Sequence, residues 1–196
     1  MNQTPSPPAD LKPCPPPHDG SDLWVFAYGS LMWDPGFPFE EARPAKLGGY
    51  HRAFCFYSTR YRGTTEKPGL VLGLDRGGSC HGIAYRVAAE KVEPTLAYLW
   101  EREMTGNAYV CKMLPVRMSH MTVKARAFVV NRASENYAGK LPLERAAALI
   151  AQGHGQRGSC RAYLENTVRH LDKMGLSDPG LHKLLAAVHE VQERVG

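Results

Sequence analysis

The order in which strand-like and helix-like segments follow one another constrains the fold of this chain most strongly. Before Asn131, short apolar and aromatic runs that end at turn residues predict strands, with one helix among them. After Asn131, segments rich in alanine and leucine predict helices. Strands gathered first and helices last indicate an α+β fold rather than alternating α/β. Five or six short strands are compatible with a small barrel, but the residues alone leave closure open.

The predicted elements rest on local signals. Residues 75–79 are rich in glycine and predict the turn of a β-hairpin, and a second hairpin turn is expected near 119–121. Ser159 predicts the N-cap of a helix that Gly175 ends. The predicted strands cover residues 23–27, 48–58, 70–74, 82–87, 109–118 and 123–130, and the predicted helices cover residues 94–105, 142–152, 159–174 and 178–194.

One domain, residues 23–196, is expected to follow a disordered tail, residues 1–22. Seven of the fifteen prolines fall in this tail, whose few large aliphatic side chains cannot offset the entropy lost on ordering. No apolar run reaches the roughly 18 residues of a membrane helix, so no membrane association is expected. The start lacks a basic segment followed by an apolar one, as a secretory signal requires, which predicts the cytoplasm.

Charge and metal-ligand patterns exclude several kinds of function. The net charge of +5 favours anionic partners, but the basic residues are spread out without a run of four, so nucleic-acid binding is not expected. The cysteines form no C-x-x-C pair, and the histidines form no H-x-x-x-H pair. We therefore expect no metal site.

Residues 153–158, Gly-His-Gly-Gln-Arg-Gly, match the dinucleotide-binding pattern G-x-G-x-x-G. That pattern carries its function only where it follows a strand and opens a helix. Here it follows a predicted helix. We therefore interpret residues 153–158 as a glycine-rich connector between two helices.

The run Ala27-Tyr28-Gly29-Ser30-Leu31-Met32 joins a buried strand to a glycine-serine turn. Glycine allows a ligand to approach the backbone closely, and successive free N–H groups in such a turn suit a carboxylate. Ser30 adds a hydroxyl group. An ordinary turn that ends a strand explains the same residues, and the sequence at this point leaves both interpretations open.

Glu103 stands at an unusual position on the helix predicted over 94–105. Leu96, Leu99, Trp100 and Glu103 follow the spacing i, i+3, i+4, i+7, which places the carboxylate on the apolar stripe, while Glu101 and Arg102 are expected to point elsewhere. Desolvation there would raise the pKa of Glu103 and suit it to proton transfer near neutral pH. A buried ion pair with an arginine, or a helix end open to solvent, explains the spacing equally well.

Several segments, in order, resemble the ChaC-type γ-glutamylcyclotransferases, and most strongly their bacterial branch. The resemblance extends over about residues 23–190 and departs from the family at Ala27, where glycine is usual. It is carried by residues 24–33 (WVFAYGSLMW), 49–55 (GYHRAFC), 62–64 (RGT), 68–69 (PG), 81–86 (HGIAYR) and 99–104 (LWEREM), followed by Tyr109. The Tyr163-Leu164 segment and the last predicted helix also fit the family.

This resemblance implies a mixed fold with a small β-barrel flanked by helices. It implies a cytosolic enzyme that cleaves glutathione into 5-oxoproline and cysteinylglycine without metal or organic cofactor. Glu103 maps onto the family's general acid/base, and Tyr109 onto a tyrosine near its pocket. The family's substrate loop maps onto Ala27, Tyr28, Gly29, Ser30, Leu31 and Met32.

Two other functions stay open at this point. One is a cyclotransferase for other γ-glutamyl amines or dipeptides, and the other is a non-catalytic binding protein on the same scaffold, such as an RNA-binding barrel. The residues that recognise the Cys-Gly half of glutathione, and the oligomeric state, are not predicted.

Overall fold

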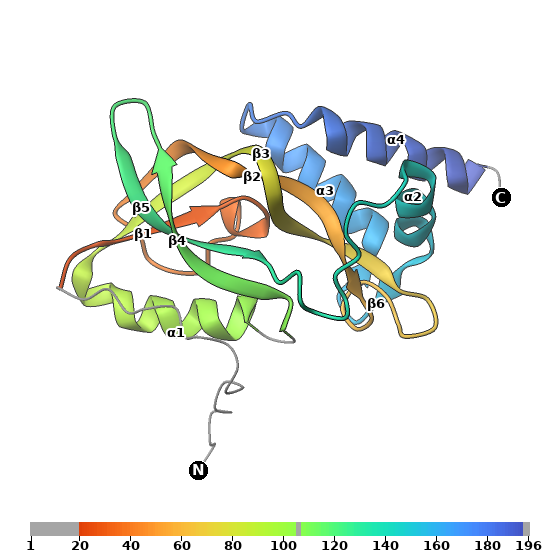
Figure 1. Cartoon of the computed structure of the whole chain (residues 1–196), viewed down its shortest axis with the longest axis horizontal. Helices are drawn as coiled ribbons and strands as arrows, with labels where there is room; N and C mark the ends of the chain where they lie inside the picture. Colours follow the sequence, from red (N-terminus) through yellow and green to blue (C-terminus); the bar gives the residue numbers. More distant parts are fainter. Residues whose placement is uncertain (1–19, 105–106, 194–196) are drawn as a thin grey trace, which may run out of the picture.

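A closed five-stranded barrel forms the centre of the computed structural model, which describes residues 20–104 and 107–193 (Figure 1). Its strands lie in the order β1-β3-β2-β4-β5. They are β1 (Leu23–Ala27), β2 (Glu41–Ser58), β3 (Gly69–Val87), β4 (Tyr109–Arg117) and β5 (Thr122–Val130). Strand β1 pairs antiparallel with β3 and parallel with β5, so the barrel is mixed. The expected α+β fold with a small mixed barrel is confirmed.

The long pair β2–β3 departs from the predicted strands. Residues 75–79 are not a hairpin turn but the middle of one strand of 19 residues, and the turn of the hairpin lies instead between Ser58 and Gly69. The pairing shifts register between Gly48 and Tyr50, where Gly49, Gly77 and Gly78 all have positive φ. Glycine adopts this backbone conformation freely, so the glycines form a bulge that bends the pair without ending it.

The hairpin β4–β5 and the helix before it follow the prediction. The turn of the hairpin closes with the Met118 N–H donating to the Met121 carbonyl at 2.8 Å. Helix α1 (Val92–Glu103) begins two residues earlier than expected and lies along the barrel (Figure 1). Its Leu99 is fully buried in the main core, a burial worth about 1.5–3 kcal/mol for a side chain of this size.

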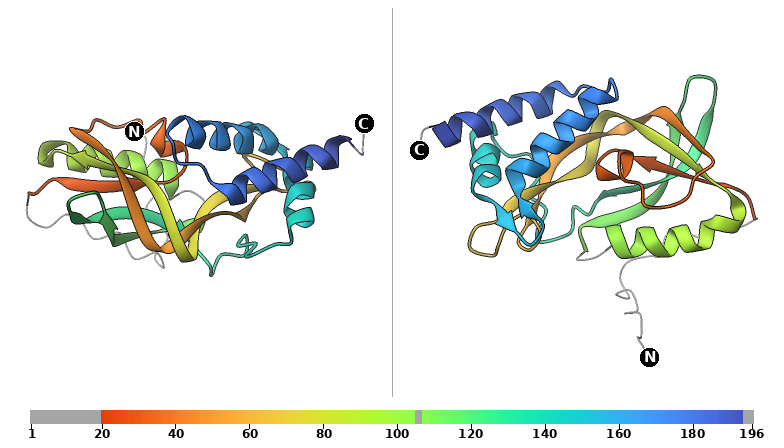
Figure 2. Two further views of the ribbon diagram at one scale, coloured as in Figure 1. Left: turned by 90° about the horizontal axis from the view of Figure 1, so that it is seen from above. Right: turned by 180° about the vertical axis from the view of Figure 1, so that it is seen from behind.

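The C-terminal part is helical, as expected. Helices α2 (Leu143–Gln152), α3 (Cys160–Lys173) and α4 (Pro179–Glu193) gather at the end of the molecule away from α1, and the β2–β3 pair extends from the barrel to them (Figures 1 and 2). Ser159 caps α3 by accepting from the Ala162 N–H at 3.1 Å, and Gly175 beyond its end has a φ of 67°.

The expected tail, residues 1–22, falls largely outside the described residues, which begin at Gly20. Asp22 is held against the barrel by an ion pair from Arg86 at 2.5 Å and a hydrogen bond from the Ala89 N–H at 3.1 Å. Among the described residues, no helix is both long enough and apolar enough to cross a membrane.

Candidate active site

A cavity of about 1140 Å³ opens between α1, the β2–β3 loop and α3. Ser30, Glu103 and Tyr109 line this cavity, and Tyr163 lines it from α3. Trp33 stacks on His170 with ring centroids 4.5 Å apart, which joins the segment after β1 to α3 across the cavity. Segments more than 100 residues apart in the sequence therefore contribute to one site.

Glu103 is the last residue of α1 and lines this cavity with its side chain only 15% exposed. Desolvation raises the pKa of Glu103, and the positive charges of Arg102 and Arg157 oppose this rise without cancelling it. The C-terminal end of a helix also carries partial negative charge, which disfavours a carboxylate there. Glu103 is thus a shielded carboxyl group suited to accepting and returning a proton near neutral pH.

The helical spacing predicted that Arg102 points away from the site, but its side chain lies in the site. Its Nε lies 3.3 Å from Glu103 Oε1, and its Nη2 donates to Ser30 Oγ at 3.0 Å. A third bond runs from Nη1 to the Tyr98 hydroxyl oxygen at 2.7 Å. The prediction was wrong because Arg102 stands in the last turn, where a long side chain can extend past the helix end. The guanidinium group joins Glu103 to the turn after β1.

Of the six residues of the expected substrate loop, only Ser30 lines the cavity. Ala27, Leu31 and Met32 are buried in the main core, the last two on a 3-10 helix, Ser30–Met32. Gly29 has a φ of −128°, so a positive φ is not what requires glycine there. A Cβ on Gly29 would stand 3.4 Å from a side-chain carbon of Leu72, which is an ordinary contact distance.

Buried Arg52 holds the backbone of this loop. Its Nε donates to the Tyr28 carbonyl at 2.7 Å and its Nη2 to the His81 carbonyl at 2.6 Å. Its Nη1 pairs with Asp178 just before α4, at 3.0 Å. Arg52 thereby fixes the end of β1 to β3 and to the C-terminal helices.

Three tyrosines surround Glu103. Burial raises the pKa values of Tyr28, Tyr109 and Tyr163, and the charge of Glu103 raises all three further. Tyr109 donates to the Leu72 carbonyl at 2.7 Å. Their hydroxyl groups therefore remain protonated at neutral pH, and the single hydroxyl proton of Tyr109 is already donated to Leu72. Tyr163 was not among the predicted site residues, although its segment contributed to the family resemblance.

Arginines dominate the charge of the cavity wall. Among the described lining residues, five are arginines (Arg60, Arg62, Arg102, Arg157 and Arg169) and three are acids (Asp34, Glu101 and Glu103). A net positive wall attracts anionic substrates. The described ranges contain no group of three or more histidine, cysteine, aspartate or glutamate side chains placed to hold a metal ion.

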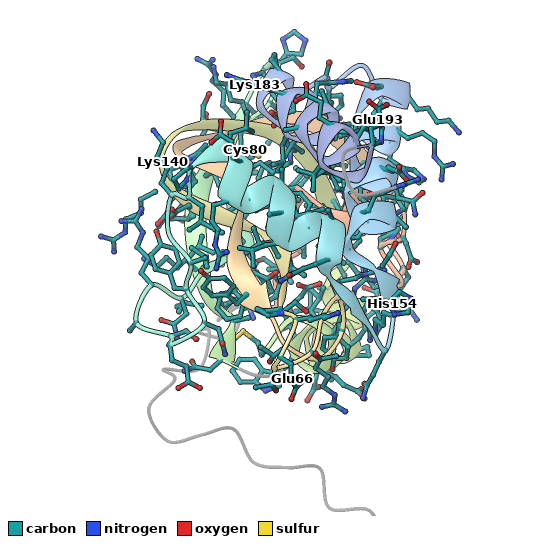
Figure 3. The ribbon with its side chains drawn as sticks, turned by 90° about the vertical axis from the view of Figure 1, so that its right-hand side faces the viewer. Glu66, Cys80, Lys140, His154, Lys183 and Glu193 are labelled. Carbon is teal, nitrogen blue, oxygen red and sulfur yellow. The ribbon has the colours of Figure 1, made fainter. Side chains whose placement is uncertain are left out.

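The glycine-rich residues 153–158 connect α2 to α3, as predicted, and form a small hairpin of β6 (His154–Gly155) and β7 (Gly158–Ser159). The hairpin docks on the β2–β3 loop, with the N–H groups of Gln156 and Arg157 donating to the carbonyls of Arg60 and Tyr61, both at 2.9 Å. Figure 3 shows Glu66 and His154, one from each loop, near the same edge of the molecule. The docked hairpin brings Arg157 to the cavity.

Comparison with known proteins identifies the family to which this chain belongs. A family model described as ChaC-like protein matches residues 23–191. The glutathione-specific γ-glutamylcyclotransferase of Escherichia coli K12 is 37% identical over 174 residues, which cover 88% of this chain and 75% of that protein. The human glutathione-specific γ-glutamylcyclotransferase 1 is 35% identical over 185 residues, which cover 89% of this chain and 82% of that protein.

A solved structure shares the fold. The crystal structure of the γ-glutamylcyclotransferase specific to glutathione from yeast superposes with a TM-score of 0.78. The alignment covers 87% of this chain and 99% of the yeast chain, at 23% identity. The arrangement of barrel and helices described above is therefore that of a known γ-glutamylcyclotransferase fold.

Proposed function

Because the chain belongs to the ChaC-like protein family, we propose that it is a γ-glutamylcyclotransferase that cleaves glutathione into 5-oxoproline and cysteinylglycine. The proposed catalytic residue is Glu103, as general acid and base. The proposed substrate-binding residues are Tyr109 and the loop of Ala27, Tyr28, Gly29, Ser30, Leu31 and Met32, and the proposed location is the cytoplasm.

The observation that carries this proposal is a shielded carboxyl group on the wall of a large cavity. Glu103 faces a cavity of about 1140 Å³ that has room for a tripeptide, and the Arg102 guanidinium joins it to Ser30, which lines the same cavity. Its pKa is raised by burial, which brings it closer to neutral pH, where a general base is most effective. The adjacent Arg102 does not fill the cavity.

The reaction requires one proton acceptor that becomes a donor. The γ-glutamyl α-amine is an ammonium at neutral pH, and the Glu103 carboxylate takes one of its protons. The free amine nitrogen then forms a bond to the γ-carbonyl carbon, closing a five-membered ring. The bond from that carbon to the cysteine nitrogen breaks, and Glu103 gives its proton to the leaving nitrogen. The ring nitrogen loses its second proton by the same route, so 5-oxoproline forms as a neutral lactam and cysteinylglycine leaves as an ammonium. The carboxylate is restored, and no water is consumed.

The rest of the site would position the substrate for ring closure. Holding the amine against the γ-carbonyl can contribute roughly 7–11 kcal/mol to catalysis. The Tyr28–Leu31 backbone would bind the glutamyl α-carboxylate or the γ-carbonyl oxygen, and Tyr109 would contact the substrate beside it. Arg102 is a positioning residue, because it fixes Glu103 relative to Ser30.

The direct test is the release of 5-oxoproline from glutathione. We expect wild-type protein to release it and Glu103→Gln to lose at least about 100-fold in kcat, within the range for loss of a general base. Glu93→Gln is the matched control, because it removes an exposed carboxylate from the other end of the same helix. Unchanged turnover by Glu103→Gln would refute the mechanism. Faster turnover of γ-glutamyl-alanine than of glutathione would indicate a different γ-glutamyl substrate.

A further inference from the structure

Two guanidinium groups share one aromatic ring in the lining of the cavity. The Arg157 guanidinium lies 4.6 Å from the centre of the Tyr61 ring, and that of Arg60 lies 5.4 Å from the same centre. Within residues 20–104 and 107–193, neither arginine forms an ion pair, and Arg60 bonds only to the neutral Gln156 side chain, at 3.2 Å. Like charges held close together without an acid between them favour the binding of an anion.

The backbone that carries Arg157 is held firmly. Its N–H donates to the Tyr61 carbonyl at 2.9 Å, and its carbonyl accepts a hydrogen bond from Arg62 Nη1. A Cβ on Gly155 would stand 2.5 Å from the Arg60 carbonyl oxygen, and one on Gly153 would stand 2.5 Å from that of Arg62. Glycine is therefore required for the hairpin to dock this closely. The glycine-rich connector thus fixes an arginine side chain at the cavity.

Arg157 and Glu103 both line the cavity, as the two ends of one bound substrate would require. The described residues contain no ion pair between them, yet the charge of Arg157 lowers the pKa of Glu103, so the two lie apart but within electrostatic range. The glutamyl α-carboxylate must stay beside Glu103, because it shares a carbon with the amine. The second carboxylate of glutathione lies two residues beyond the γ-carbonyl, about 7 Å away in an extended chain.

We propose that Arg157, with Arg60 beside it on the Tyr61 ring, binds the C-terminal carboxylate of the substrate. This inference rests on the proposed function and adds to it the recognition of the cysteinylglycine half. Arg157 is then a specificity-determining residue: it favours a γ-glutamyl peptide whose far end carries a negative charge. A guanidinium group suits this role, because its planar fork can hold both oxygens of a carboxylate.

The test compares glutathione with glutathione amide, in which the glycine carboxylate is replaced by an uncharged carboxamide of nearly the same size. We expect kcat/KM of the wild-type protein to be about 10- to 100-fold higher for glutathione, in line with the loss of one charged hydrogen-bonded contact. Arg157→Gln is expected to remove this preference by lowering kcat/KM for glutathione much more than that for the amide. Both rates are measured on the pH plateau, because the charge of Arg157 also lowers the pKa of Glu103. Arg157→Lys should retain part of the preference.

The control variant is Arg145→Gln, which removes one positive charge from the exposed face of α2, outside the cavity. It is expected to behave as wild type with both substrates. Equal turnover of glutathione and the amide by wild type would overturn the inference. So would an equal loss on both substrates in Arg157→Gln, which would place the α-carboxylate at Arg157 instead. Because the wild-type comparison needs no variant, poor folding of Arg157→Gln leaves the test intact. Wild-type protein that releases 5-oxoproline from neither substrate would refute the proposed function itself.

Discussion

Replacing Arg52 tests how the site is attached to the fold. Arg52→Met keeps an unbranched apolar side chain as far as the position of Nε but removes the donors to the Tyr28 and His81 carbonyls. Each carbonyl left buried without a donor costs about 1–3 kcal/mol. The partly exposed Asp178 side chain can turn to water and adds less. We expect a loss of about 3–5 kcal/mol in the free energy of unfolding, as for other broken buried pairs.

The measurement is equilibrium unfolding in urea, where a loss of this size lowers the midpoint while the slope m stays the same. Asp178→Asn is the matched comparison. It removes the charge that pairs with Arg52 but keeps an oxygen that can accept from the Gly180 and Leu181 N–H groups. We expect it to cost less than half as much. If Arg52→Met lost under 1 kcal/mol, or if the two variants were equal, the two carbonyl contacts would not anchor the loop.

Two further predictions concern the catalytic carboxylate and the glycine-rich hairpin. The charge of Arg102 lowers the pKa of Glu103, and the carboxylate is the proposed active form. Arg102→Gln should therefore shift the acid limb of the pH profile of kcat to higher pH. An unshifted limb would contradict this effect of the Arg102 charge on Glu103. Gly155→Ala should lower the thermal midpoint and raise the KM for glutathione at least several-fold, because its Cβ would force the hairpin away from Arg60. Gly180→Ala, with 3.3 Å to its nearest atom, is a milder control, and equal effects would refute this reasoning.

The sequence predicted elements whose signals are local. β1 has the predicted bounds, because an apolar run and a following turn define both of its ends. Residues 75–79 were misassigned, because a glycine-rich run has the same composition in a turn and in a bulge. The partner that distinguishes them, Gly49, lies more than 25 residues away. Local pattern cannot reveal such pairing.

The candidate site was predictable only where one helix or turn carries it. Helical spacing brought Glu103 to attention, the glycine-serine turn brought Ser30, and the family resemblance added Tyr109. Arg157 and Tyr163 were missed as site residues because they reach the cavity only through packing of the C-terminal helices. On α3, Tyr163, Asn166 and His170 follow the spacing i, i+3, i+7 of one face, a signal that could have been used. The catalytic and substrate-binding roles stay predictions.

Glu103 is the last residue of α1, so the position of its carboxyl group depends on the length of that helix. Each residue of an α-helix advances the chain by about 1.5 Å and turns it by about 100°. Inserting or deleting one residue between Leu99 and Glu103 would swing the carboxyl group about a quarter of a turn around the helix axis, away from Ser30. Such length changes should be far less tolerable here than in the loop that joins β4 to β5.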